Sequence, residues 1–261
     1  MFLKLFKYDF LSVFKKLVFY YIVLFSSAII AKILYYLFVN TKWQLAIQLP
    51  TEIFFLAVGF GNVATVILCM IRYYKNMLSD EGYLTHTLPV KKSSILLSKL
   101  LVTLVSELIT ILAIMVSLLI YSPDIYVEIV KAVSQLFVNI EIKELIEVIY
   151  VMILFGIIVV LLGIFEVTLV AMCLSLGATF NKSKVTKAIL IYIGISMGLS
   201  IFVSFFVTSI IINIVAPGIE YGMGVVYLGL WIFIFVEIIG IIATYIINLQ
   251  VLKNKLNLEQ E

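Results

Sequence analysis

Long apolar runs alternate with short polar segments along the whole chain. Each run reaches the ~20 residues that an α-helix needs to cross the hydrocarbon core of a bilayer. All four prolines fall between the runs, where helices are expected to end. The fourth run is the longest, so its helix is expected to tilt or to project beyond the bilayer. The pattern predicts six transmembrane helices: Leu17–Val39, Glu52–Tyr74, Ile95–Tyr121, Val148–Ala178, Ala188–Val215 and Val225–Val251.

The segment Met1–Lys16, before the first run, has a different pattern. Aromatic residues recur at helical spacing, among them Phe6, Phe10 and Phe14, and lysines lie between them. An aromatic face with lysines on the other side is typical of a helix that lies in the membrane interface. We therefore expect an interfacial helix over residues 1–16. The alternative is a simple extension of the first span.

The composition supports a membrane protein. Of the 261 residues 64% are apolar and 13% are charged, whereas a soluble domain is about half apolar and a quarter charged. We expect a single transmembrane domain over residues 1–261, with membrane lipid as a partner. The net charge of +3 is small and gives no indication of nucleic-acid binding. Cys69 and Cys173 both lie in apolar runs, which favours neither a disulfide nor a metal site.

The basic residues predict the orientation, because lysine and arginine concentrate in cytoplasmic segments. With the N-terminus inside, three lysines fall in outer segments and Lys32 lies within the first span. The other 14 of the 18 basic residues fall on the inner side: Lys4, Lys7, Lys15, Lys16, Arg72, Lys75, Lys91, Lys92, Lys99, Lys182, Lys184, Lys187, Lys253 and Lys255. Both termini are therefore expected in the cytoplasm, and the first span is expected to remain as an anchor, since it is too long for a signal peptide.

The polar stretch Tyr73–Leu100 has the most informative pattern between two spans. Ser79 is a plausible helix N-cap, acids follow in the first turn, and Pro89 stops the segment. A short helix over Asp80–Leu88, in a cytoplasmic loop over residues 75–94, is the resulting prediction. Such a helix is expected to dock a soluble partner through its acids and its apolar residues: Asp80, Glu81, Tyr83, Leu84 and Leu88.

The run DEGYLTHTLPVKKSSILLSKLL, Asp80–Leu101, resembles the signature loop of ABC-2-type transporter permeases of Gram-positive bacteria. His86 departs from that pattern, where an apolar or small residue is expected. The resemblance implies an all-α membrane protein of ABC-2-type exporter permease architecture in the bacterial cytoplasmic membrane. It also implies that the loop carries a coupling helix for a separate ATPase, present in two copies, and that the permease pairs with a second copy or a paralogue.

The outer segment over residues 122–147 is predicted to be a helical element. Ser122, Pro123 and Asp124 make a good helix start, an apolar stripe follows at helical spacing, and glutamates make the segment acidic. One interpretation is a hairpin that rests on the membrane and caps the spans. The other is an external lid that meets a cationic substrate.

Glutamates stand well inside three predicted spans, at Glu107, Glu166 and Glu237. A charged group there costs ~3 kcal/mol or more, so such residues usually face protein or water. They are candidates for a polar patch along a substrate or proton path. Protonated glutamates in interhelical hydrogen bonds are the alternative.

The fifth span holds Gly194 and Gly198, whose spacing permits close approach of two helices. The family resemblance implies a dimer contact through the first and fifth spans. Packing within one subunit is the alternative.

Chemistry for catalysis is not evident in the sequence. The fragment GATFNKS, Gly177–Ser183, has Asn181 where a phosphate-binding loop needs glycine, and it follows a membrane span rather than a strand. A single histidine, His86, leaves no credible catalytic or metal set, and a loop contact or solvent exposure is its expected role.

The expected function follows from these points and from the resemblance. We expect no enzyme and no cofactor in this chain, but a permease subunit whose partner ATPase binds ATP and Mg. The expected cargo is hydrophobic or amphipathic: a peptide, an antimicrobial peptide, a lipid or a drug. The alternatives are an ion- or proton-coupled carrier working alone, and a membrane immunity protein or scaffold without an ATPase partner.

Overall fold

The structure is a computed structural model that describes residues 2–39, 43–79, 81–87, 90–122, 142–180, 182–215 and 224–254, with the single positions 127, 131 and 134. These residues form α-helices joined by turns, and no strand occurs among them. Six of the helices are long and apolar enough to cross a membrane. Each predicted span falls within one of these helices to within a residue, which confirms the prediction of an all-α, multi-pass membrane protein.

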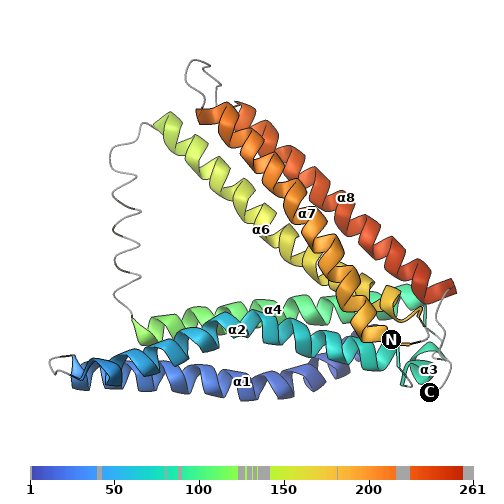
Figure 1. The fold of residues 1–261 in the computed structure, drawn as a ribbon, viewed down its shortest axis with the longest axis horizontal. Coiled ribbons are helices and arrows are strands. Elements are labelled where there is room, and N and C mark those ends of the chain that lie inside the picture. Colours follow the sequence, from blue (N-terminus) through green and yellow to red (C-terminus); the bar gives the residue numbers. More distant parts are fainter. Residues whose placement is uncertain are drawn as a thin grey trace. The chain divides into compact units, whose positions relative to one another are not determined.

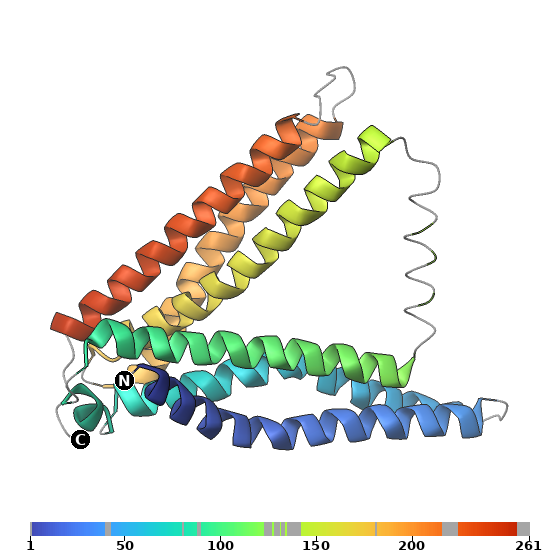
Figure 2. The ribbon, with the colours of Figure 1, turned by 180° about the vertical axis from the view of Figure 1, so that it is seen from behind.

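The helices form two compact units, and the sequence-based expectation of one functional domain stays a prediction. The first unit comprises residues 1–72 and 97–141. It contains α1 (Phe2–Phe38), most of α2 (Gln44–Met77) and most of α4 (Lys92–Tyr121), which run alongside one another in both views (Figures 1 and 2). Its core consists of small and aliphatic side chains with one large aromatic ring: Val13, Leu17, Leu24, Ala28, Ala31, Phe54, Cys69 and Val102.

Residues 2–16 do not form a separate helix, which agrees with the alternative of an extension of the first span. They continue into the first span as one unbroken helix, α1. Asp9 and Val13 are buried, and Val13 belongs to the same core cluster as Cys69 of α2 and Val102 of α4. The apolar face of this segment therefore packs partly against protein, whereas its lysines are exposed. Its depth in a membrane stays a prediction.

Pro50 lies inside α2 rather than between helices. It is in the second turn, where its missing N–H removes a hydrogen bond close to the start of the helix rather than in its middle. Thr51 next to it donates its hydroxyl to the Ile47 carbonyl at 2.8 Å. The expectation that this proline ends the helix was wrong because a proline near the first turn costs much less than one in the interior.

The second unit comprises residues 73–96 and 142–261. It contains the end of α2, the short α3 (Glu81–His86), the start of α4, α6 (Ile142–Gly177), α7 (Lys184–Val215) and α8 (Gly224–Asn254). The helix α6 packs against both α7 and α8, and the three helices run alongside one another in Figures 1 and 2. Because α6 begins at Ile142, the last residues of the predicted outer segment 122–147 belong to it. Most of that segment lies outside the described residues.

A tight connection joins α6 to α7. A Cβ atom added at Gly177 would stand 2.6 Å from both the Ala188 Cβ and the Lys184 carbonyl oxygen. Only glycine allows the end of α6 to approach the start of α7 this closely. The GATFNKS fragment therefore begins at a close helix–helix contact, and Ser183 in it has a positive φ of 52°.

Candidate functional site

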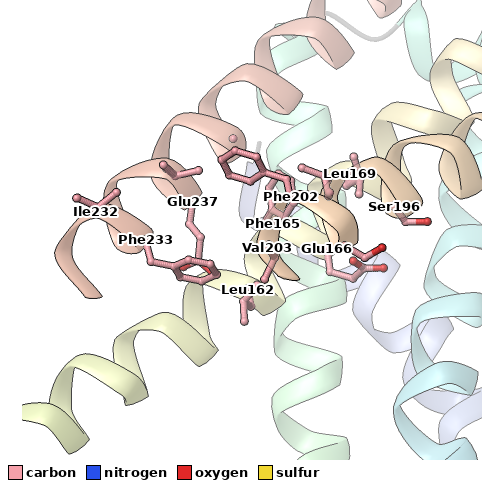
Figure 3. A pocket seen from close by; sticks show the side chains of 14 residues that line it. Leu162, Phe165, Glu166, Leu169, Ser196, Phe202, Val203, Ile232, Phe233 and Glu237 are labelled. Atoms are coloured by element: carbon pink, nitrogen blue, oxygen red, sulfur yellow. The ribbon is translucent and has the colours of Figure 1, made fainter. Parts of the chain in front are cut away.

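A cavity of about 430 Å³ lies between α6, α7 and α8 of the second unit (Figure 3). Its size is in the range of 300–1,000 Å³ that is usual for small-molecule sites. Its polar residues are Glu166, Ser196, Ser200 and Glu237, and each of the three helices contributes at least one. The other lining residues are apolar: Leu162, Phe165, Leu169, Leu199, Phe202, Val203, Ile232, Phe233, Val236 and Gly240.

Two of the three predicted path glutamates therefore line the same cavity. Figure 3 shows Glu237 on α8 and Glu166 on α6, with Phe165 and Val203 between them in this view. Glu107 lies on α4 in the first unit, and it is half-buried. The assignment of the glutamates to a substrate or proton path stays a prediction.

The two cavity glutamates have different surroundings. Glu166 accepts a hydrogen bond of 2.5 Å from the Tyr192 hydroxyl on α7, so one carboxylate oxygen already has a partner. Glu237 is 6% exposed, and neither of its carboxylate oxygens has a hydrogen-bond partner among the described residues. A buried carboxyl without partners is costly, since it has lost water and gained nothing in return.

The serines of the cavity are occupied by their own helix. Ser196 donates to the Ile193 carbonyl at 3.1 Å and Ser200 donates to the Met197 carbonyl at 2.9 Å. Their hydroxyl oxygens can still accept a hydrogen bond. Among the described lining residues no basic side chain is present, so the fixed polar groups of the cavity are acceptors or acids.

Close contacts between α6 and α8 limit the cavity on one side. The Thr244 hydroxyl donates to the Thr168 hydroxyl at 3.0 Å, and both residues are buried. One turn away, a Cβ added at Gly240 would lie 2.8 Å from the Phe165 ring. The absence of a side chain at Gly240 therefore lets the ring of Phe165 approach α8 closely at the cavity wall.

The predicted docking helix exists in the second unit but is shorter than expected. It is α3, Glu81–His86, instead of Asp80–Leu88. Asp80, Leu88 and Pro89 lie outside the described residues, and the side chains of Tyr83, Leu84 and His86 are not described either. The Ser79 hydroxyl donates to the Lys75 carbonyl at 2.7 Å, at the end of α2, and the Ser79 carbonyl accepts from the Gly82 N–H at 2.7 Å, at the start of α3.

The loop that carries α3 is anchored where it leaves α2. The Tyr73 hydroxyl lies 2.8 Å from the Ser175 hydroxyl of α6 and donates to the Asn248 Oδ1 of α8 at 3.2 Å. All three side chains are buried. If Ser175 donates to Tyr73 and Tyr73 donates to Asn248, every hydrogen of the two hydroxyls is used. We call Tyr73, Ser175 and Asn248 the tyrosine anchor.

The loop is anchored a second time where it enters α4. Lys92 donates from Nζ to the Leu252 carbonyl at 2.8 Å, in the last turn of α8. The last carbonyls of a helix have no partner in the helix itself, and a lysine there is favoured by the helix dipole as well. We call this contact the lysine anchor. Both ends of the α3 loop are thus held by α8, and one of them also by α6.

Sequence reasoning missed an ion cluster in the first unit. Lys99 of α4 donates to Asp9 of α1 at 2.5 Å, and both side chains are only 7% exposed. Arg72 of α2 lies 3.6 Å from the other Asp9 oxygen and is 33% exposed. A signal was present: Asp9 lies four and eight residues before the buried Val13 and Leu17, so an acid stands on the apolar face of the helix.

The structure also bears on the glycine pair in α7. A Cβ added at Gly194 or Gly198 would meet no described atom within 4 Å. These glycines therefore do not mediate a close helix contact within the described part of their own unit, which disfavours the intrasubunit alternative. A contact with a second permease chain stays a prediction.

Comparisons with known proteins identify no relatives: no family description, curated protein or solved structure matches the chain. The described residues also contain no group of three or more histidine, cysteine, aspartate or glutamate side chains placed to hold a metal ion. The candidate site is therefore interpreted from its own geometry: a largely apolar cavity with two carboxyls, and a loop anchored to two of the helices that line it.

Proposed function

We propose that this chain is the transmembrane permease subunit of an ATP-driven ABC exporter of the ABC-2 type. It would move hydrophobic or amphipathic cargo, such as a peptide, an antimicrobial peptide, a lipid or a drug, out of a bacterial cell. Two ATPase subunits would bind ATP and Mg, and a second permease copy or a paralogue would complete the complex.

One observation carries the proposal: the α3 loop is tied to the helices of the cavity at both of its ends. The tyrosine anchor connects its start to α6 and α8, and the lysine anchor connects its end to α8. Nine of the 14 residues that line the cavity belong to α6 and α8, and the other five belong to α7, which neither anchor contacts. A displacement of the loop would therefore act on α6 and α8 directly.

The mechanism that follows is mechanical. When the ATPase pair closes on ATP, it would push on α3, and the two anchors would carry this displacement to the C-terminal ends of α6 and α8. Because the two anchors contact α6 and α8 but not α7, α6 and α8 would shift relative to α7 and change the opening of the cavity. The chain would supply binding surfaces and two arrangements of helices, without reaction chemistry of its own.

Affinity purification of the tagged chain from its native membrane, followed by mass spectrometry, tests the proposal. An ATPase with a phosphate-binding loop is the expected companion. The double variant Tyr83→Ala with Leu84→Ala should reduce the amount of ATPase recovered, since it removes the apolar side chains predicted to dock α3. Phe180→Ala with Val185→Ala is the matched control, because it makes similar deletions in the α6–α7 connection. Recovery of the folded chain with no ATPase would contradict the proposal.

The proposal also requires α3 in the cytoplasm, together with both termini. Single cysteines in place of Lys91 and of Lys131 test this with a thiol reagent that does not cross the membrane. Lys131 should react in intact cells and Lys91 only after the membrane is opened. Equal reaction of both positions from one side would refute this topology.

A carrier that works without an ATPase is the second candidate, and the two carboxyls of the cavity favour it. It requires that the purified chain alone, in liposomes, moves cargo when only an ion or proton gradient is imposed. The ABC proposal expects no transport under that condition.

A further inference from the structure

We propose that the cavity between α6, α7 and α8 binds a cationic amphiphile with a single ammonium group, which pairs with Glu237 while the hydrocarbon part lies against the apolar wall. The inference rests on the proposed function in one respect, since it names the chemical class of the cargo. The binding itself needs neither ATP nor a partner chain.

The charge of the ligand follows from Glu237. Both of its carboxylate oxygens are buried without a partner among the described residues, although the residue lines a cavity. Hydrogen bonding and an opposite charge would remove the cost of that burial. An ammonium group provides both, and a turn of the Glu237 side chain toward the cavity would bring the oxygens to it.

An anion or a neutral polar ligand fits less well. The described lining residues include no lysine, arginine or histidine, and the two serine hydroxyl hydrogens are already donated to carbonyls of α7. A metal ion would need more oxygen or nitrogen ligands than one free carboxyl supplies. The unused bonding capacity of the cavity is therefore that of an acceptor with negative charge.

The apolar part of the ligand follows from the rest of the wall. Ten of the 14 lining residues are apolar, and three of them are phenylalanines, one from each helix: Phe165, Phe202 and Phe233. Aromatic faces pack against hydrocarbon and also attract an ammonium group. A small cation without a chain would leave most of this surface unused, so we commit to an amphiphile.

Glu166 has a secondary place in this arrangement. Its bond to Tyr192 means that one oxygen is already used, and the carboxyl is partly exposed. Two carboxyls on different helices would draw the ammonium group into the cavity, but only Glu237 lacks a partner of its own.

Binding of radiolabelled dodecylamine to the purified chain tests the inference. The chain is placed in phosphatidylcholine nanodiscs without nucleotide, and the signal of empty nanodiscs is subtracted. We expect saturable binding that unlabelled dodecylamine displaces and that dodecanol and dodecanoate displace at least tenfold less well. Glu237→Gln should weaken binding about tenfold or more, since it removes the negative charge that pairs with the ammonium group.

The matched control is Glu107→Gln, which removes the charge of a glutamate in a transmembrane helix of the other unit and should leave binding within a factor of two. Val203→Trp provides an independent variant: it fills the cavity without changing charge and should abolish binding. Size-exclusion profiles and thermal unfolding midpoints near those of the parent chain show that each variant is folded. If Glu237→Gln does not fold, Val203→Trp together with the three competitors still decides the result.

Equal displacement by dodecanol would overturn the inference, because the cavity would then be a site for lipid tails without charge selection. Unchanged binding in folded Glu237→Gln or Val203→Trp would overturn it as well, because the amine would then sit elsewhere. The result is separable from that of the proposed function. Amine binding without an ATPase companion would refute the exporter and support the amine site. An ATPase companion without amine binding would support the exporter and refute the amine site.

Discussion

Replacement of Tyr73 by phenylalanine is the most direct perturbation of the link between the α3 loop and the cavity helices. The change removes one buried hydroxyl and keeps the ring. It deletes the contacts to Ser175 at 2.8 Å and to Asn248 at 3.2 Å, and it leaves both polar groups without this partner. Hydrogen bonds between transmembrane helices contribute roughly 0.6–1.7 kcal/mol each, so the anchor should lose about 1–3 kcal/mol.

The loss should appear as local opening rather than global unfolding, because the apolar cores of the unit are untouched. A change of 1–3 kcal/mol corresponds to about a 5- to 150-fold increase in the population of the opened anchor. Hydrogen–deuterium exchange in nanodiscs measures this directly. The peptides that contain Ser175 and Asn248 should exchange faster by that factor, whereas peptides of the first unit should not change.

Tyr245→Phe is the matched control, since it removes the hydroxyl of a tyrosine on α8 that does not belong to the tyrosine anchor. It should leave exchange unchanged. With the proposed ATPase bound, Tyr73→Phe should also lower the stimulation of ATP hydrolysis by cargo while ATPase recovery stays normal. Equal exchange in both variants would show that the anchor contributes nothing measurable and would remove the physical basis for the coupling route.

The other predictions concern stability. Lys99→Met removes the close ion-pair partner of the buried Asp9 and should cost about 3–5 kcal/mol in the free energy of unfolding, measured by thermal or SDS denaturation. Lys99→Met combined with Asp9→Leu should recover most of that loss, and a double variant no better than the single one would contradict this explanation. Gly177→Ala forces a Cβ into the Lys184 carbonyl and should lower the unfolding midpoint clearly, while Gly194→Ala, which meets open space, should not; similar midpoints would refute the close contact. Ser183→Gly relieves a positive φ and should raise the midpoint slightly, and a decrease would mean that the serine has another role.

The sequence by itself determined the number and placement of the membrane helices. Apolar runs of this length and composition have no stable alternative to helices in lipid, where every backbone hydrogen bond must be made within the chain. It also predicted a short helix between the second and third spans, and α3 lies there, although the hydroxyl of its expected cap, Ser79, donates to a carbonyl of α2. The ends of the helices were predicted less well than their number. Pro50 lies within α2 rather than before it, and residues 2–16 belong to α1.

Tertiary structure decided which polar residues meet. All three span glutamates look alike in the sequence, since each is a single acid in an apolar run, yet only Glu166 and Glu237 line the same cavity and only Glu237 lacks a partner among the described residues. The tyrosine anchor joins residues that are 102 and 175 positions apart in sequence. Helical periodicity fixes the face on which a residue lies but not the neighbour that packs on that face, because this depends on the rotation and register of whole helices against one another.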